Sequence, residues 1–177
     1  MRKKVVYFII AGGSAVLGAS PWLMEFLERW EGVEYVVYAD KLAGGLPTVC
    51  SGITKHTSPY PVVLGERWSK EKCKETTQKI ALEIQRELAK CITNPDTPQS
   101  VFDALSDHGW HFGVRRTCNS ASANEINKGN FKKGCDLLAY KPSGAPNWSY
   151  VGSTFIQGLH NRAKARRELC LKDLSTD

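Results

Sequence analysis

Apolar side chains recur with a helical period in several parts of the chain. Between residues 22 and 31 they occupy every third or fourth position, with charged residues between them, and Gly32 follows. This spacing predicts a short amphipathic helix over residues 22–31. A longer stripe predicts a helix from an N-cap at Ser69 to about residue 92, and its members are Cys73, Thr77, Ile80, Ile84, Leu88 and Cys91.

Four more helices are expected in the second half of the chain. The dipeptide Thr97-Pro98 is typical of a helix start, and the helix it opens runs toward Gly109. The other three cover residues 122–128, residues 131–138 and about residues 154–171, and a loop rich in proline and glycine fills residues 141–152.

The last of these helices has a mixed face. Its predicted apolar side comprises Phe155, Leu159, Ala163 and Cys170. Among its cations, Arg162 is expected to be a structural partner of another side chain, whereas Arg166 and Arg167 are expected on a solvated face.

Residues 33–53 have a different pattern. β-Branched and aromatic residues gather at 33–38, a second extended run covers 46–53, and Gly44-Gly45 between them is a turn signal. An early hairpin flanked by helices predicts an α+β fold with a small β-hairpin lobe and a larger helical lobe.

The N-terminal segment carries its charges only at its start. Arg2, Lys3 and Lys4 precede residues 5–24, which contain no charged residue and as a helix span about 30 Å, one bilayer core. We expect an N-terminal hydrophobic helix for membrane insertion or export, with residues 1–24 separate from a domain at 25–177. A cleaved signal peptide, a permanent anchor and a marginally held export segment all fit this composition.

Composition and charge narrow the class of protein. The chain has 177 residues, 42% of them hydrophobic and 24% charged, as in one globular domain. Half of the net charge of +6 comes from the three cations at the N-terminus, which leaves 21 basic residues against 18 acidic ones. This mild excess is not typical of nucleic-acid binding, so we expect no nucleic-acid partner. We also expect a monomer.

The six cysteines are more than a core of this size requires. None belongs to a C-x-x-C pair, and such long gaps are untypical of zinc sites, so we expect three disulfides and neither a metal nor a cofactor. Disulfides predict a periplasmic or extracellular destination. The spacing does not determine which cysteines pair.

Two carboxyl groups and a hydroxyl form a candidate catalytic set. Glu31 ends the first predicted helix, Asp40 lies in or just after the first strand, and Thr48 opens the second extended run. Cleavage of a glycosidic bond needs one protonated carboxyl group and one ionised carboxylate. The C-terminal end of a helix disfavours an anion, which favours the protonated form of Glu31. A hairpin can bring the three side chains together.

The sequence around these residues resembles the tailed-phage lysozyme family of muramidase endolysins. The resemblance covers nearly all of residues 25–172, and it rests on Glu31-Gly32-Val33, Tyr38-Ala39-Asp40, Gly45–Gly52, Phe112-Gly113-Val114, Gly134-Cys135-Asp136 and the segment from Gly158 to Cys170. It implies a two-lobed, lysozyme-like fold. It also implies hydrolysis of the β-1,4 bond between N-acetylmuramic acid and N-acetylglucosamine in peptidoglycan, with lysis of the host cell.

The resemblance assigns roles to the three candidate residues. Glu31 is then the general acid, and Asp40 is the ionised partner that positions water or stabilises the oxocarbenium-like state. Thr48 helps to position the water. The sequence departs from the family at Ile53, where a histidine is common, and in the loop Lys41–Pro47, which is longer than in the best-known members.

The resemblance also extends to the N-terminus and the cysteines. Some members have an uncleaved signal-anchor-release segment, and residues 5–24 resemble one. This implies an inactive enzyme tethered to the host inner membrane, which acts in the periplasm after release. The family topology implies the disulfides Cys50–Cys73, Cys91–Cys118 and Cys135–Cys170.

Two other functions stay open. His108 and His111, with His160 or a cysteine as a further ligand, would suggest a zinc amidase that also cuts the cell wall. A tethered wall-binding module would keep the fold and lack the acid.

Overall fold

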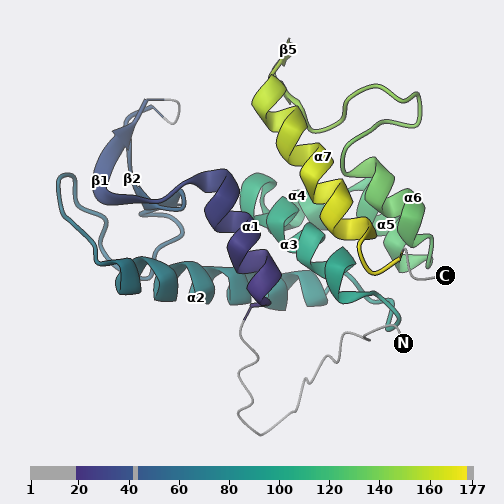
Figure 1. The fold of residues 1–177 in the computed structure, drawn as a ribbon, viewed down its shortest axis with the longest axis horizontal. Helices are drawn as coiled ribbons and strands as arrows, with labels where there is room; N and C mark the ends of the chain where they lie inside the picture. Colours follow the sequence, from purple (N-terminus) through teal and green to yellow (C-terminus); the bar gives the residue numbers. More distant parts are fainter. Residues whose placement is uncertain (1–18, 42–43, 175–177) are drawn as a thin grey trace, which may run out of the picture. The chain divides into compact units, whose positions relative to one another are not determined.

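The computed structural model describes residues 19–41 and 44–174, and Figure 1 shows their helices and strands. Most of the predicted hydrophobic helix, up to residue 18, lies outside the described residues. Within the described ranges, no helix is long and apolar enough to cross a membrane. The chain divides into two compact units, the N-terminal unit (residues 18–83) and the C-terminal unit (from residue 84).

Helix α1 (Pro21–Glu31) opens the N-terminal unit and confirms the first predicted helix. Ser20 caps it, because its Oγ accepts a hydrogen bond from the Leu23 amide at 3.0 Å. The helix buries Leu23 and Leu27 and ends where Gly32 adopts a φ of 68°, a left-handed conformation that glycine tolerates. The predicted boundary after residue 24 lies inside this helix.

Three antiparallel strands follow in the order β1-β2-β3, and they cover Glu34–Asp40, Leu46–Cys50 and Ile53–Thr54. They match the two extended runs predicted from the sequence. The segment that ends at Trp68 also hydrogen-bonds with β1. The Val37 amide donates to the Glu66 carbonyl at 2.9 Å, and the Trp68 amide donates to the Tyr35 carbonyl at 2.8 Å.

Helix α2 (Lys70–Ala89) begins in the N-terminal unit and ends in the C-terminal one. Ser69 caps it as predicted, with its Oγ 3.0 Å from the Lys72 amide. A disulfide joins Cys73 of this helix to Cys50 at the end of β2. Cys50 itself has a φ of 54°, a left-handed value that is uncommon for a residue with a side chain.

The C-terminal unit is mainly helical. Its helices are α3 (Gln99–Phe112), α4 (Val114–Cys118), α5 (Ala121–Asn127), α6 (Phe131–Leu137) and α7 (Gln157–Leu171). Helix α3 packs along α7, and α5 packs along α6 (Figure 1). The buried side chains in the core of this unit include Leu88, Val101, Leu105, Ile126 and Leu138. Mixed with the small antiparallel sheet, these helices confirm the α+β class.

The two remaining disulfides, Cys91–Cys118 and Cys135–Cys170, both lie in the C-terminal unit. With Cys50–Cys73 they are the same three pairs that the family resemblance implied. No cysteine is left free. The N-terminal unit is therefore crosslinked by one disulfide and the C-terminal unit by two.

The structure corrects the sequence prediction just before α7. Strands β4 (Tyr150–Val151) and β5 (Thr154–Phe155) form a hairpin where a loop and a helix start were expected. Phe155 belongs to β5 and is 40% exposed, so its predicted place on the apolar face of the last helix is wrong. β-Branched and aromatic residues on both sides of a glycine turn favour a hairpin over a helix. Helix α4 was also missed, because five residues are too few to show a period.

The structure also corrects part of the prediction for the arginines of α7. Asp107 on α3 is fully buried and accepts hydrogen bonds from Arg162 Nη2 at 2.6 Å and from Arg166 Nε at 2.5 Å. Arg162 is thus a structural partner, as predicted, but the solvated position predicted for Arg166 is wrong. Burial opposes the charge of Asp107, yet the two guanidinium groups outweigh it and hold the pKa of its carboxyl below the usual value. Arg167 is partly exposed and donates to Asp136 at 2.7 Å.

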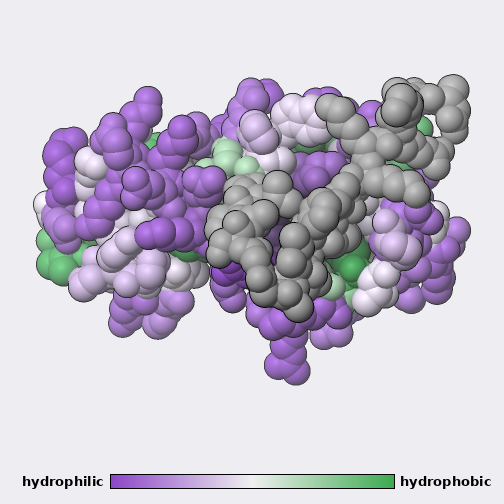
Figure 2. Space-filling model, turned by 90° about the horizontal axis from the view of Figure 1, so that it is seen from below, coloured by the Kyte–Doolittle hydropathy of each residue, from purple (hydrophilic) through white to green (hydrophobic). Residues whose placement is uncertain are grey.

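Most of the coloured surface on the face drawn in Figure 2 is hydrophilic, and hydrophobic residues show in small, separate areas. The most exposed large apolar side chains are Val63 and Leu64 in the N-terminal unit and Val151 in the C-terminal unit. Scattered exposure of this kind is normal for a globular protein.

Candidate active site

The C-terminal end of α1 positions the first candidate residue. Glu31 is the last residue of this helix and is partly exposed. Its carboxylate lies against the turn between β2 and β3, because a Cβ placed on Gly52 would be only 3.2 Å from Glu31 Oε2. Gly52 also has a φ of 77°, so both its conformation and this close approach require glycine.

The register of the sheet brings Asp40 and Thr48 to one face. Asp40 is paired with Leu46, and Tyr38 is paired with Thr48 on the neighbouring strand. Residues two apart on a strand share a face, so Tyr38 and Asp40 lie on the same side as Leu46 and Thr48. Asp40 is half-buried, whereas Thr48 is buried and its Oγ1 donates to the Leu46 carbonyl at 3.0 Å.

Tyr38 belongs to this group although sequence reasoning did not select it. Its pKa is raised, first by burial and then by the negative charges of Asp40, Glu34 and Glu31. Glu31 and Asp40 therefore both lie within electrostatic range of one phenol group. The signal was present in the sequence, because Tyr38 stands two residues before Asp40 on the same predicted strand and so shares its face.

All three predicted residues thus belong to the N-terminal unit, and the helix end, the hairpin and the β2–β3 turn hold them. A carboxyl group at a helix end, a second carboxyl group on a strand and a buried hydroxyl are the groups that acid-assisted cleavage of a glycosidic bond uses. All six cysteines form disulfides, so none of them offers a nucleophilic thiol.

The two departures from the family pattern lie beside this group. Ile53, at the position where the family commonly has histidine, is fully buried and is the first residue of β3. It therefore packs inside the unit. Of the longer loop, Lys41 and residues 44–47 are described, and residues 42–43 lie outside the described ranges.

The histidines of the amidase hypothesis have other contacts. His108 is buried, and its Nδ1 lies 2.8 Å from Thr117 Oγ1. His111 packs edge-on against Phe112, and His160 Nδ1 lies 3.1 Å from Ser149 Oγ. Among the described residues, no group of three or more His, Cys, Asp or Glu side chains could hold a metal ion.

The family model described as phage lysozyme matches residues 28–166 of the chain. A search of curated protein sequences gave no match.

Solved structures share the fold at low sequence identity. The active form of the P1 phage endolysin Lyz has a TM-score of 0.73 and 19% identity, over 90% of this chain and 88% of that chain. A mutant of P22 lysozyme has a TM-score of 0.70 and 23% identity, over 86% of this chain and 97% of that one. The muramidase domain of SpmX from Asticaccaulis excentricus has a TM-score of 0.67 and 18% identity, over 86% of this chain and 97% of that domain.

Proposed function

This chain belongs to the phage lysozyme family and is a glycoside hydrolase that acts on peptidoglycan, and we propose that it cleaves the β-1,4 bond between N-acetylmuramic acid and N-acetylglucosamine. Cleavage of this bond in the wall of a bacterial host lyses the cell. The observation that carries the proposal is the convergence in the N-terminal unit, where Glu31 contacts the β2–β3 turn and Asp40 and Thr48 share one sheet face.

In the proposed mechanism, Glu31 is the general acid that protonates the leaving glycosidic oxygen. Asp40 stays ionised and either positions the water or stabilises the oxocarbenium-like state. Thr48 helps to position the water through its hydroxyl. Since its Oγ1 proton is donated to the Leu46 carbonyl, its oxygen keeps a lone pair that accepts a hydrogen bond from that water.

The test uses purified peptidoglycan and counts new reducing ends on muramic acid. We expect such ends from the unaltered protein and a loss of about 10²- to 10⁴-fold in Glu31→Gln, because the amide cannot donate the proton. The matched control is Glu28→Gln, an exposed glutamate one helical turn earlier on α1, which should keep full activity.

Two outcomes would contradict the proposal. If Glu31→Gln released reducing ends at the rate of the unaltered protein, the acid would be another residue. If the unaltered protein and the variant both bound peptidoglycan and neither released ends, the wall-binding module would be the correct function.

We also propose that residues 5–24 tether the enzyme to the host inner membrane and that it acts in the periplasm after release. The charge-free run behind three cations supports the tether, and the three disulfides support an oxidising compartment. Fractionation before and after membrane depolarisation tests this, because the full-length chain should move from the membrane to the soluble fraction. Recovery of only a shortened chain would indicate a cleaved signal peptide instead.

A further inference from the structure

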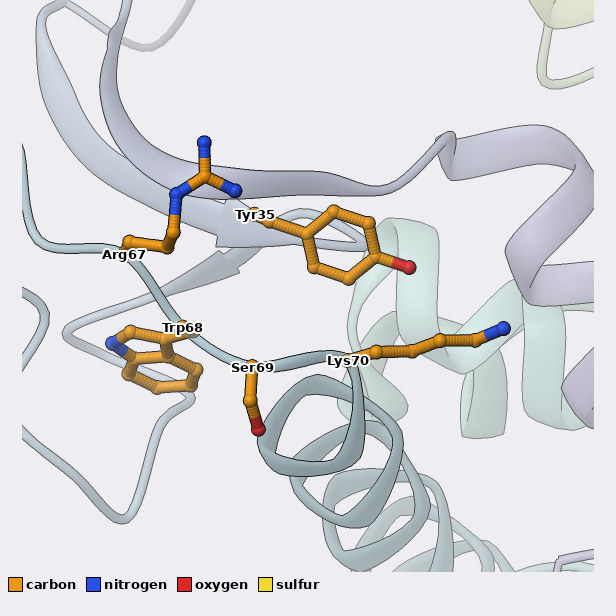
Figure 3. Close-up of a pocket in the computed structure, with 5 residues that line it drawn as sticks. All are labelled: Tyr35, Arg67, Trp68, Ser69 and Lys70. Atoms are coloured by element: carbon orange, nitrogen blue, oxygen red, sulfur yellow. The ribbon is translucent and has the colours of Figure 1, made fainter.

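The N-terminal unit has a second feature outside the candidate active site, an open pocket of about 490 Å³ (Figure 3). It is lined by Tyr35 of β1, by Arg67, Trp68 and Ser69, and by Lys70 at the start of α2. Tyr35 and Trp68 are held next to each other by the backbone hydrogen bond from the Trp68 amide to the Tyr35 carbonyl. The pocket is therefore built on paired backbone and not on a free loop.

The charge of this pocket is positive and not neutralised. Arg67 and Lys70 are exposed, and neither side chain has an ion-pair or hydrogen-bond partner among the described residues. Lys72, in contrast, forms an ion pair and a cation-π contact, because its Nζ lies 3.3 Å from Glu66 Oε1 and 3.8 Å from the centre of the Trp68 ring. Two cations are thus left available at one concave site.

The walls of the pocket add an apolar component. Figure 3 shows Tyr35 and Lys70 extended in the same direction, whereas Arg67 points away from Lys70 and Trp68 lies on the other side of the backbone segment. The Nε1 donor of Trp68 is buried and has no hydrogen-bond partner among the described residues. Cations beside aromatic rings suit a ligand that combines a carboxylate with short aliphatic side chains, as an acidic peptide does.

We propose that this pocket binds a carboxylate of the peptide stems that branch from the glycan strand of peptidoglycan. Lys70, which extends beside Tyr35, would pair with the carboxylate, and Tyr35 would contact the aliphatic part of the stem. Arg67 points to another side in Figure 3 and would add positive charge at the rim of the pocket. The inference rests on the proposed function, since it concerns the same substrate, and it adds a specificity-determining site for the peptide part.

The geometry of the chain is compatible with one substrate reaching both sites. Tyr35 follows Glu31 by four residues, so their Cα atoms are at most about 14 Å apart. An extended peptide of about four or five residues spans a similar length, roughly 14–18 Å. A stem attached near the bond at Glu31 can therefore extend to the pocket.

The test compares two substrates, intact peptidoglycan and glycan strands from which an amidase has removed the stems. In the double variant Arg67→Gln/Lys70→Gln we expect KM for intact peptidoglycan to rise on the order of tenfold with kcat unchanged. On stem-free strands the variant should match the unaltered protein. The double variant Arg67→Lys/Lys70→Arg keeps both positive charges. If its KM for intact peptidoglycan equals that of the unaltered protein, the effect is due to the two charges.

The matched control removes the same number of charges elsewhere in the unit. Lys55→Gln/Lys74→Gln changes two exposed lysines that do not line the pocket, and it should leave both KM values unchanged. An equal rise of KM in the control, or an equal rise on both substrates, would overturn the inference. Either result would mean general attraction between a basic protein and an anionic polymer.

Failure of the proposed function gives a different result. In that case the unaltered protein would release no reducing ends from either substrate. Co-sedimentation with insoluble intact peptidoglycan then tests the pocket separately, because it needs no catalysis. If the Arg67→Gln/Lys70→Gln variant sedimented with this material as the unaltered protein does, the pocket would not bind stems.

Discussion

Asp40 and Asp107 belong to different compact units and occupy opposite environments. Asp107 in the C-terminal unit is fully buried, and each of its oxygens accepts a hydrogen bond from an arginine. Asp40 in the N-terminal unit is half-buried at the end of a strand that reaches a turn. A neutralised, buried carboxylate can serve stability, whereas one that substrate and water can reach can serve chemistry. The difference supports the proposal that the N-terminal unit carries the catalytic residues.

The largest expected effect comes from Asp40→Asn. The amide keeps the shape of the side chain and removes its charge, so activity on peptidoglycan should fall about 10²- to 10⁴-fold while the free energy of unfolding changes little. Initial rates and urea unfolding measure the two quantities. Glu34→Gln on the same strand is the control and should stay active. A large loss of stability in Asp40→Asn would place it in the same class as Asp107.

The reverse pattern is expected for Asp107→Asn. Loss of this charge removes the carboxylate that the buried Arg162 and Arg166 both contact, which should lower the free energy of unfolding by about 3–5 kcal/mol. Activity per folded molecule should stay near that of the unaltered protein. Asp136→Asn, which breaks a partly exposed pair with Arg167, should cost no more than about 1 kcal/mol. Equal costs in the two variants would show that burial does not distinguish them.

A smaller effect is expected from Gly52→Ala, and Gly65→Ala is its matched control. Both glycines have left-handed φ values, 77° and 81°, so each alanine should cost about 1–2 kcal/mol of stability. Only at Gly52 does the added methyl group meet Glu31 Oε2, whereas at Gly65 nothing lies within 4 Å. Activity should therefore fall roughly 10- to 100-fold in the first variant alone. Equal activities of the Gly52→Ala and Gly65→Ala variants would mean that a displacement of Glu31 does not affect catalysis.

The smallest effect is a pH dependence in the C-terminal unit. Burial first, and then the charge of Arg166, lower the pKa of His108 well below its usual value, against the opposing charge of Asp107. Below about pH 6.5 His108 is protonated in the unfolded chain but stays neutral in the folded protein. The contribution of His108 to the free energy of unfolding is therefore complete above about pH 6.5 and is lost as pH falls below this value. The slope approaches about 1.4 kcal/mol per pH unit for one proton.

Urea unfolding of the unaltered protein and of His108→Gln between pH 7.5 and 5 measures this slope. His160→Gln is the control, because burial and Lys164 lower the pKa of His160 at a more exposed position. The low pKa of Asp107 acts in a separate window, since its stabilisation is lost only as pH falls below its usual value near 3.8. An unchanged slope in His108→Gln would contradict the assignment.

Long periodic elements were predictable from the sequence. The period of three and four residues identified α1 and α2. Ser69 was predicted as the N-cap of α2, whereas Ser20, which caps α1, was not selected. The short elements α4, β4 and β5 were not found, because two to five residues cannot show a period.

The candidate site was only partly predictable from the sequence. Spacing allowed Glu31, Asp40 and Thr48 to meet, but their choice came from a family resemblance and not from the spacing. The register that pairs Tyr38 with Thr48 was not predictable, since it depends on the turn and includes an irregularity between Glu34 and Tyr38. The burial of Arg166 depends on Asp107, 59 residues away in sequence, and no local pattern shows such a contact.

Helix α1 has a practical consequence for protein engineering. Its buried residues Leu23 and Leu27 fix its rotation, and Glu31 is its last residue. Insertion or deletion of one residue between them would turn Glu31 by about 100° and shift it by about 1.5 Å along the axis. Affinity tags, fusion partners and N-terminal truncations should therefore end before Ser20, which leaves the cap and the whole helix in register.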